Sequence, residues 1–176
     1  GIFVKFGTVT MNSGTISGNS GAGGGVFVCD TPGTFTMSGG TITGNSAGSG
    51  ANPGGGVRIG GSGTFIMDGG VITANSAGYG GGVGVDYLSG NGGTFIKRGG
   101  TIYGNNAGAD SNNADASGNG HAVFAGRTDI PSPANNKYRD TTAGTGIRMY
   151  YYNGGMNDPG SLPDFPAVNT SGQWLP

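Results

Sequence analysis

The sequence predicts an all-β fold, a right-handed parallel β-helix of about five coils with three short strands per coil and an irregular C-terminal cap. Three observations support this prediction: a motif that recurs four times, apolar–polar alternation within each repeat, and glycines at constant offsets between the alternating segments. A fixed period of this length is typical of solenoids. The right-handed form follows from the strong handedness rule for parallel crossovers.

Each copy of the recurring motif reads Gly, Thr, a bulky apolar residue, Thr or Ile, and then Met or Lys. The copies begin at Gly7, Gly33, Gly63 and Gly93, with successive spacings of 26, 30 and 30 residues. A Gly-Thr/Val-Ile unit follows each copy, beginning at Gly14, Gly40, Gly70 and Gly100. An asparagine lies five residues beyond each of these glycines, at Asn19, Asn45, Asn75 and Asn105.

Each repeat contains three short segments in which apolar and polar residues alternate. In the second repeat they are residues 26–28, 34–37 and 41–43. Alternation with period two in β-branched and aromatic residues indicates strands, and the absence of a 3.6-residue period excludes a helical solenoid. Three strands joined at glycine corners make one coil of a parallel β-helix.

Stacked coils place equivalent residues in ladders about 4.8 Å apart, the spacing of neighbouring strands. Three inward ladders are expected: Val9, Phe35, Phe65 and Phe95; Ile16, Ile42, Ile72 and Ile102; and Ile2, Val26, Val57, Val83 and Val123. The four asparagines form a corner ladder in which amides bond to one another or to turn backbone. The column of Thr8, Thr34, Thr64 and Thr94 faces outward.

Glycine supplies 43 of the 176 residues, a fraction that is also typical of disordered chains. A disordered chain would not require Phe35, Phe65 and Phe95 to keep a constant offset from the glycines, so the pattern argues against disorder. Glycine is instead expected where the chain turns with positive φ or passes close to another coil.

One domain is expected, with β-helix repeats over residues 1–125 and a capping segment over residues 126–176. Residues 1–4 align with residues 25–28, so the chain starts inside a coil, as expected of a module cut from a larger protein. Residues 148–152 are expected to add a last strand. Whether the C-terminal aromatic residues bind ligand or only form the cap is open: Tyr150, Tyr151, Tyr152 and Trp174.

Charge and composition exclude several classes of function. The net charge is −1, charged residues make up 10%, and no basic run exists, so nucleic-acid binding is not expected. No apolar stretch is long enough for a membrane helix. Cys29 and His121 are the only cysteine and histidine, and both fit structural positions. No Cys-based metal site, cofactor or catalytic residue is therefore expected, and whether the loop acids Asp110 and Asp115 bind Ca²⁺ stays open.

Loop length varies at two corners of the repeat, the one after residues 26–28 and the one after the asparagine ladder. Insertions in solenoids map to one face, often the binding face. Both corners flank the same strand, so its outward residues are expected to form a groove floor between loop walls. The candidate carbohydrate-binding residues are Phe27, Arg58, Tyr79, Asp86, Tyr87, Asp110 and Phe124. Aromatic rings stack on sugar faces, and the polar groups bond to hydroxyls.

The pattern Gly-Thr-Phe-x-Met-x-Gly-Gly-x-Ile-x-x-Asn-x-Ala, in residues 33–47 and 63–77, resembles parallel β-helix repeats of large surface and secreted proteins from gut bacteria and spirochaetes. A unit of this size looks most like the β-helical carbohydrate-binding modules attached to gut bacterial xylanases. The resemblance implies a secreted, extracellular bacterial module that binds xylan or a related plant β-glycan without catalysis. It also implies a covalently linked catalytic domain. The motif marks coil positions only and transfers no binding residue.

Other functions stay open at this point. The coils could form a segment that extends a surface adhesin. Alternatively, the groove could belong to a polysaccharide lyase or glycoside hydrolase. Asp30 and Asp86 end equivalent strands about two coils apart, near 10 Å, a marginal distance for a pair of catalytic carboxyl groups. The outward threonines of the early coils also suggest an ice-binding face, although Ile66 and Ile96 interrupt the second column.

Overall fold

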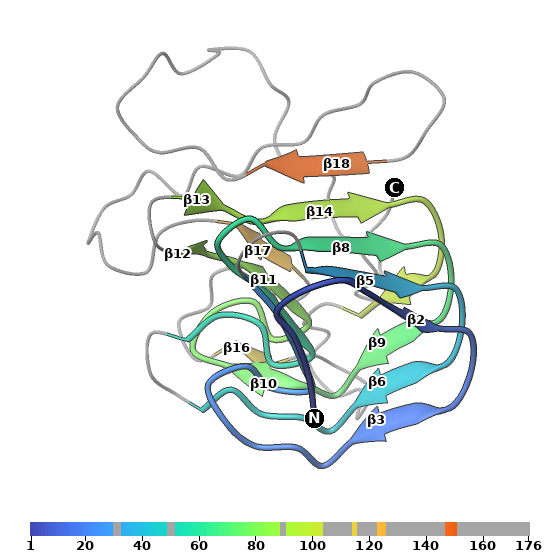
Figure 1. Cartoon of the computed structure of the whole chain (residues 1–176). Helices are drawn as coiled ribbons and strands as arrows, with labels where there is room; N and C mark the ends of the chain where they lie inside the picture. The colour runs from blue at the N-terminus through green and yellow to red at the C-terminus, as the bar shows by residue number, and fades with distance from the viewer. Residues whose placement is uncertain are drawn as a thin grey trace.

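The computed structural model describes residues 1–29, 33–48, 52–88, 91–103, 114–115, 123–125 and 147–150. Within them the chain forms a parallel β-helix, in which three parallel sheets run along the axis (Figure 1). The predicted fold class is confirmed, and five strands stack in the longest fully parallel sheet, as expected for about five coils.

In the described residues each of the first four coils contributes one strand to each of three sheets, here named A, B and C, and the fifth coil contributes a strand to sheet A. Sheet A contains β1 (Ile2–Val4), β4 (Val26–Val28), β7 (Val57–Ile59), β11 (Val83–Val85) and β17 (Val123–Ala125). Sheet B contains β2 (Thr8–Met11), β5 (Thr34–Met37), β8 (Thr64–Met67) and β14 (Thr94–Lys97). Sheet C contains β3 (Thr15–Ser17), β6 (Thr41–Thr43), β9 (Val71–Thr73) and β15 (Thr101–Ile102).

Three smaller features complete the described chain. Strand β10 (Ser76–Ala77) pairs in parallel with β16 (Ala114–Asp115), and β12 (Tyr87–Leu88) pairs with β13 (Asn91–Gly92) as a hairpin after sheet A. Strand β18 (Ile147–Tyr150) lies antiparallel against β14 (Figure 1). The last strand predicted over residues 148–152 is thus confirmed for residues 148–150, and residues 151–152 lie outside the described residues. The rest of the predicted cap lies outside the described residues.

The predicted inward ladders are confirmed by the strand register. Phe35 pairs with Val9 and Phe65, and Phe65 pairs with Phe95. The three phenylalanine rings are fully buried and stacked, with centroids 5.4 and 5.1 Å apart. The isoleucine and valine ladders have the same in-register pairing. The three phenylalanine rings therefore form one continuous stack within the core.

The asparagine ladder is present at the corner after sheet C. Asn19 Nδ2 donates to Asn45 Oδ1 at 2.9 Å, and Asn45 Nδ2 donates to Asn75 Oδ1 at 2.9 Å. Asn45 and Asn75 are buried, and their amides also bond to strand backbone. This satisfies polar groups that would be costly to bury alone. Asn105, the fourth predicted member, lies outside the described residues.

A methionine ladder in sheet B explains the glycine pair at the next corner. Met11 and Met37 point inward, and a Cβ added at Gly40 or Gly70 would lie 2.5 Å from the methionine Cε one coil below. Gly40 and Gly70 both have a φ of 86°. These corner glycines therefore provide both a positive φ and the space for the methionine of the preceding coil.

Lys97 continues this ladder as a buried charged residue. It pairs in register with Met67 and is buried, and desolvation lowers its pKa from the ordinary value of 10.5. The native state then binds fewer protons than the unfolded state between the lowered pKa and 10.5. Stability should therefore rise as the pH rises through that window.

Replacing Lys97 with methionine should stabilise the protein at neutral pH, because no ammonium is then desolvated. The variant should also lose the rise in stability toward alkaline pH. Urea unfolding of Lys97→Met and of the wild type at neutral and alkaline pH measures both effects. Lys5→Met, which removes a charge from an exposed position, is the matched control. A Lys97→Met protein less stable than the wild type would contradict the expectation.

Candidate functional site

The outward face of sheet A carries one row of side chains that runs along the helix axis. Its register places Phe3, Phe27, Arg58, Gly84 and Phe124 on five consecutive rungs. The sequence predicted this row, and the structure brings its members together as adjacent neighbours. Both corners with variable loops flank it, as expected.

The first three rungs form a stack of two rings and a guanidinium. The Phe3 and Phe27 centroids lie 5.4 Å apart, and Arg58 Cζ lies 4.9 Å from the Phe27 centroid. Phe3 is 60% exposed, whereas Phe27 is half-buried between its two neighbours. A cation over an aromatic face is favourable by about 0.5–2 kcal/mol. The stack holds Phe27 between Phe3 and Arg58.

Arg58 and Asp86 form a buried ion pair beside this stack. Arg58 Nη2 donates to Asp86 Oδ2 at 2.7 Å, and the two residues are 8% and 3% exposed. Arg58 Nη1 donates to Ala22 O at 2.7 Å and to Asn52 Oδ1 at 3.2 Å. Among the described residues Arg58 Nε has no hydrogen-bond partner. Arg58 thus ties loops from two corners to the sheet.

The loop after the second asparagine crosses the row instead of standing beside it. A Cβ added at Gly84 would lie 2.5 Å from Pro53 Cβ and 2.3 Å from Gly54 N. Pro53 is bridged in parallel to Tyr79. We call residues 52–54 the strap. Because Gly84 has no side chain, the strap packs directly on sheet A there, and the expected open floor at this rung is wrong.

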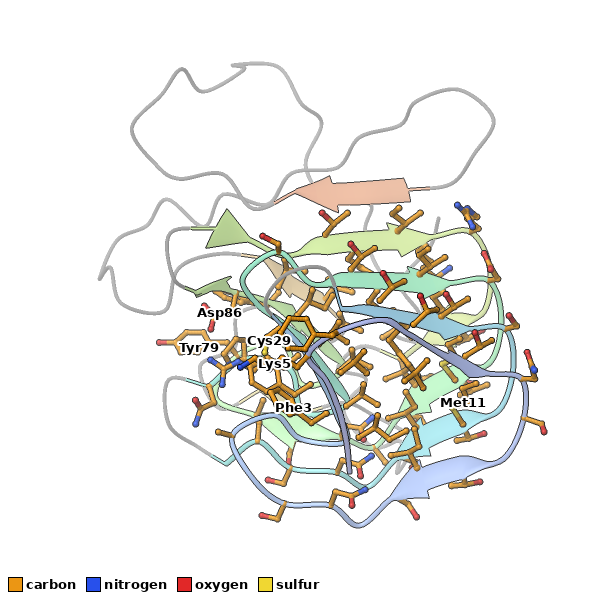
Figure 2. All side chains as sticks on the ribbon, in the orientation of Figure 1. Phe3, Lys5, Met11, Cys29, Tyr79 and Asp86 are labelled. Atoms are coloured by element: carbon orange, nitrogen blue, oxygen red, sulfur yellow. The ribbon has the colours of Figure 1, made fainter. Side chains whose placement is uncertain are left out.

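At the far end of the row, the Tyr79 ring lies over Phe124. Their centroids are 5.1 Å apart, and Phe124 is only 2% exposed whereas Tyr79 is half-buried. Phe124 therefore supports Tyr79 from below. Figure 2 shows Tyr79 and Asp86 on the same side of the molecule as Phe3, away from Met11.

The predicted site residues therefore divide into three groups. Phe27 and Tyr79 are partly accessible, while Arg58, Asp86 and Phe124 are buried and can act on a surface ligand only by holding its contacts in place. The backbone of Tyr87 begins β12 directly after Asp86. The side chain of Tyr87 and the whole of Asp110 lie outside the described residues.

Sequence reasoning missed the strap and its two functional consequences. Asn52 is half-buried at the row and bonds to Arg58, and Pro53 fills the rung at Gly84. The available signal was the glycine at an outward position whose neighbours in the row are large. A missing side chain on a ladder predicts that another part of the chain packs there.

The described part of the chain contains neither a cluster of metal ligands nor a membrane-spanning helix. No group of three or more His, Cys, Asp or Glu side chains gathers there. No helix within those residues has the length and apolar character needed to cross a membrane.

The fold defines the chain as a parallel β-helix domain with an aromatic row along one sheet. Comparison with models of protein families, with curated proteins and with solved structures finds no match.

Proposed function

We propose that this chain is a non-catalytic carbohydrate-binding module that recognises a plant cell-wall polysaccharide, xylan in the first place, on the outward face of sheet A. In this proposal it belongs to a secreted bacterial protein and is covalently linked to a catalytic domain. The observation that carries the proposal is the aromatic row. Phe3 and Phe27 lie on this row, Tyr79 packs over its Phe124 end, and all three are at least partly accessible.

Aromatic rings held rigidly at a protein surface suit sugar rings. The apolar C–H face of a sugar stacks on the ring, and neighbouring amides and hydroxyls bond to its polar edge. Phe27 is held by Phe3 and Arg58, and Tyr79 is held by Phe124, so little side-chain entropy is lost when a sugar binds. Asn52 lies between them with a side chain that can donate and accept.

In this proposal Asp86 supports the site and takes no part in chemistry. A glycosidase acid must reach the glycosidic oxygen, and Asp86 is 3% exposed with its carboxylate bonded to Arg58. The lyase or hydrolase alternative would therefore depend on other acids. Sugar release from xylan that persists in Asp86→Asn would support that alternative.

Affinity electrophoresis through gels containing soluble xylan tests the proposal. Wild-type protein should be retarded, and Phe27→Ala and Tyr79→Ala should each weaken binding about tenfold, as expected for loss of one stacking ring. Phe6→Ala is the matched control, because Phe6 is 67% exposed but lies at the corner between β1 and β2, off the row. Unchanged mobility in xylan and in a panel of other β-glycans would overturn the proposal.

A second candidate function is a spacer segment of a surface adhesin, in which the coils mainly extend the protein. Sheets B and C favour it. Their outward residues in the described strands are threonine, serine, valine and isoleucine, repeated from rung to rung without charge. Such uniform, uncharged faces are more typical of a structural spacer than of a ligand-binding site. Absence of retention on every glycan, together with a stably folded protein, would favour this candidate.

A further inference from the structure

We infer that the polysaccharide lies parallel to the axis of the β-helix and is held by several coils at once. The ligand class is then the interior of a long linear chain, not a short oligosaccharide or a chain end. This inference rests on the proposed function and adds the direction and length of the ligand.

The short strands of sheet A give the first argument. Strands β4, β7 and β11 have three residues each, and their first and third residues are buried in the core. Only the middle residue of each strand faces outward. A ligand lying along a strand would therefore meet one outward position, whereas a ligand lying along the axis would pass a new rung of the row about every 4.8 Å.

The positions of the accessible rings give the second argument. Phe3 and Phe27 occupy the first and second rungs, and Tyr79 lies over Phe124 on the fifth. Three rung spacings separate Phe27 from Phe124, a distance of about 14 Å. A ligand that stacks on Phe27 and on Tyr79 must span that distance along the axis.

The middle of the row gives the third argument. Arg58 is buried, and the strap covers the rung at Gly84, so among the side chains that the structure describes the row has no accessible aromatic ring between Phe27 and Tyr79. Asn52 is half-buried there. The row thus offers two aromatic subsites, Phe3 with Phe27 at one end and Tyr79 at the other, joined by a polar stretch. Two weak contacts on one flexible polymer reinforce each other through effective concentration, and a ligand too short to reach both gains nothing from the second.

A length series tests the inference on the unmodified protein. Calorimetric titration with linear xylan oligosaccharides, from the disaccharide upward, and with soluble polymeric xylan should show affinity rising with length. The rise should stop once the oligosaccharide spans both aromatic subsites. Tyr79→Ala and the double variant Phe3→Ala with Phe27→Ala should each remove the dependence on length, because the one remaining aromatic subsite cannot distinguish long ligands from short ones. Phe6→Ala should keep it.

The outcomes separate this inference from the proposed function. Equal affinity of the shortest oligosaccharides and the polymer would overturn the axial arrangement and leave carbohydrate binding intact. Failure of every oligosaccharide and of polymeric xylan to bind would overturn both. Where Tyr79→Ala does not fold, Tyr79→Leu keeps the packing on Phe124 and removes the stacking ring. A length dependence that survives both in Tyr79→Leu and in the double variant Phe3→Ala with Phe27→Ala would also refute the inference.

Discussion

Replacing Gly70 with alanine should destabilise the protein by about 3 kcal/mol or more, although the change adds a single methyl group. Gly70 has a φ of 86°, which costs an L-residue about 1–2 kcal/mol. The new Cβ would also lie 2.5 Å from Met37 Cε and 2.8 Å from Gly40 O. Met37 is fully buried, so neither the side chain nor the lower corner can move without disturbing the core.

Gly44→Ala is a matched control for the Gly70 variant. Gly44 also has a positive φ, 63°, but a Cβ there would meet nothing within 4 Å. Ala74 occupies the equivalent position one coil later with a φ of 53°, so alanine is already tolerated at this corner. Gly44→Ala should cost about 1 kcal/mol. Urea unfolding followed by circular dichroism compares the two, and equal losses would show that coil stacking adds nothing to the cost at Gly70.

Replacing Asp86 with alanine should cost about 3–5 kcal/mol, because it leaves the buried guanidinium of Arg58 without its counter-charge. The loss should be larger than the value of the ion pair itself, since the penalty comes mainly from the uncompensated charge. Asp68→Ala is the matched control. Asp68 bonds to Arg98 at 3.1 Å in the same Asp–Arg pairing, but both residues are exposed. It should change stability by less than about 1 kcal/mol.

A double variant distinguishes charge burial from packing. Arg58→Met with Asp86→Ala removes both charges and should recover much of the stability lost in Asp86→Ala alone, because no charge then remains buried. Chemical denaturation of the wild type, Asp86→Ala and the double variant measures this recovery. If the double variant were the least stable of the three, the hydrogen bonds of Arg58 to Ala22 and Asn52 would outweigh the cost of its buried charge.

The sequence predicted the coil and its register because the residue pattern that specifies them is periodic. Phe35, Phe65 and Phe95 recur at one offset from the glycines, and a stacked solenoid is the arrangement that buries all three together. The asparagine corner follows from the same spacing. The outward row of sheet A was predicted for this reason too, since its members alternate with buried valines in every coil.

The state of the candidate site was less predictable. Arg58 and Phe124 were expected on an accessible floor and are buried, because the strap packs on the rung where Gly84 has no side chain. The ion pair to Asp86 joins residues of different coils at a corner whose length varies. Phe3 was expected to point outward and is the most accessible ring of the row.

The sequence alone therefore determined the fold class, the three inward ladders and the asparagine corner, because a repeat of constant length leaves one way to stack its apolar residues. Only the tertiary structure decided which outward residues are accessible, since that depends on loops that differ in length from coil to coil. The strap takes the path that fills the gap at Gly84 and satisfies Arg58 through Asn52. Packing between such non-repeating segments leaves no periodic pattern in the sequence, so the sequence alone does not predict it.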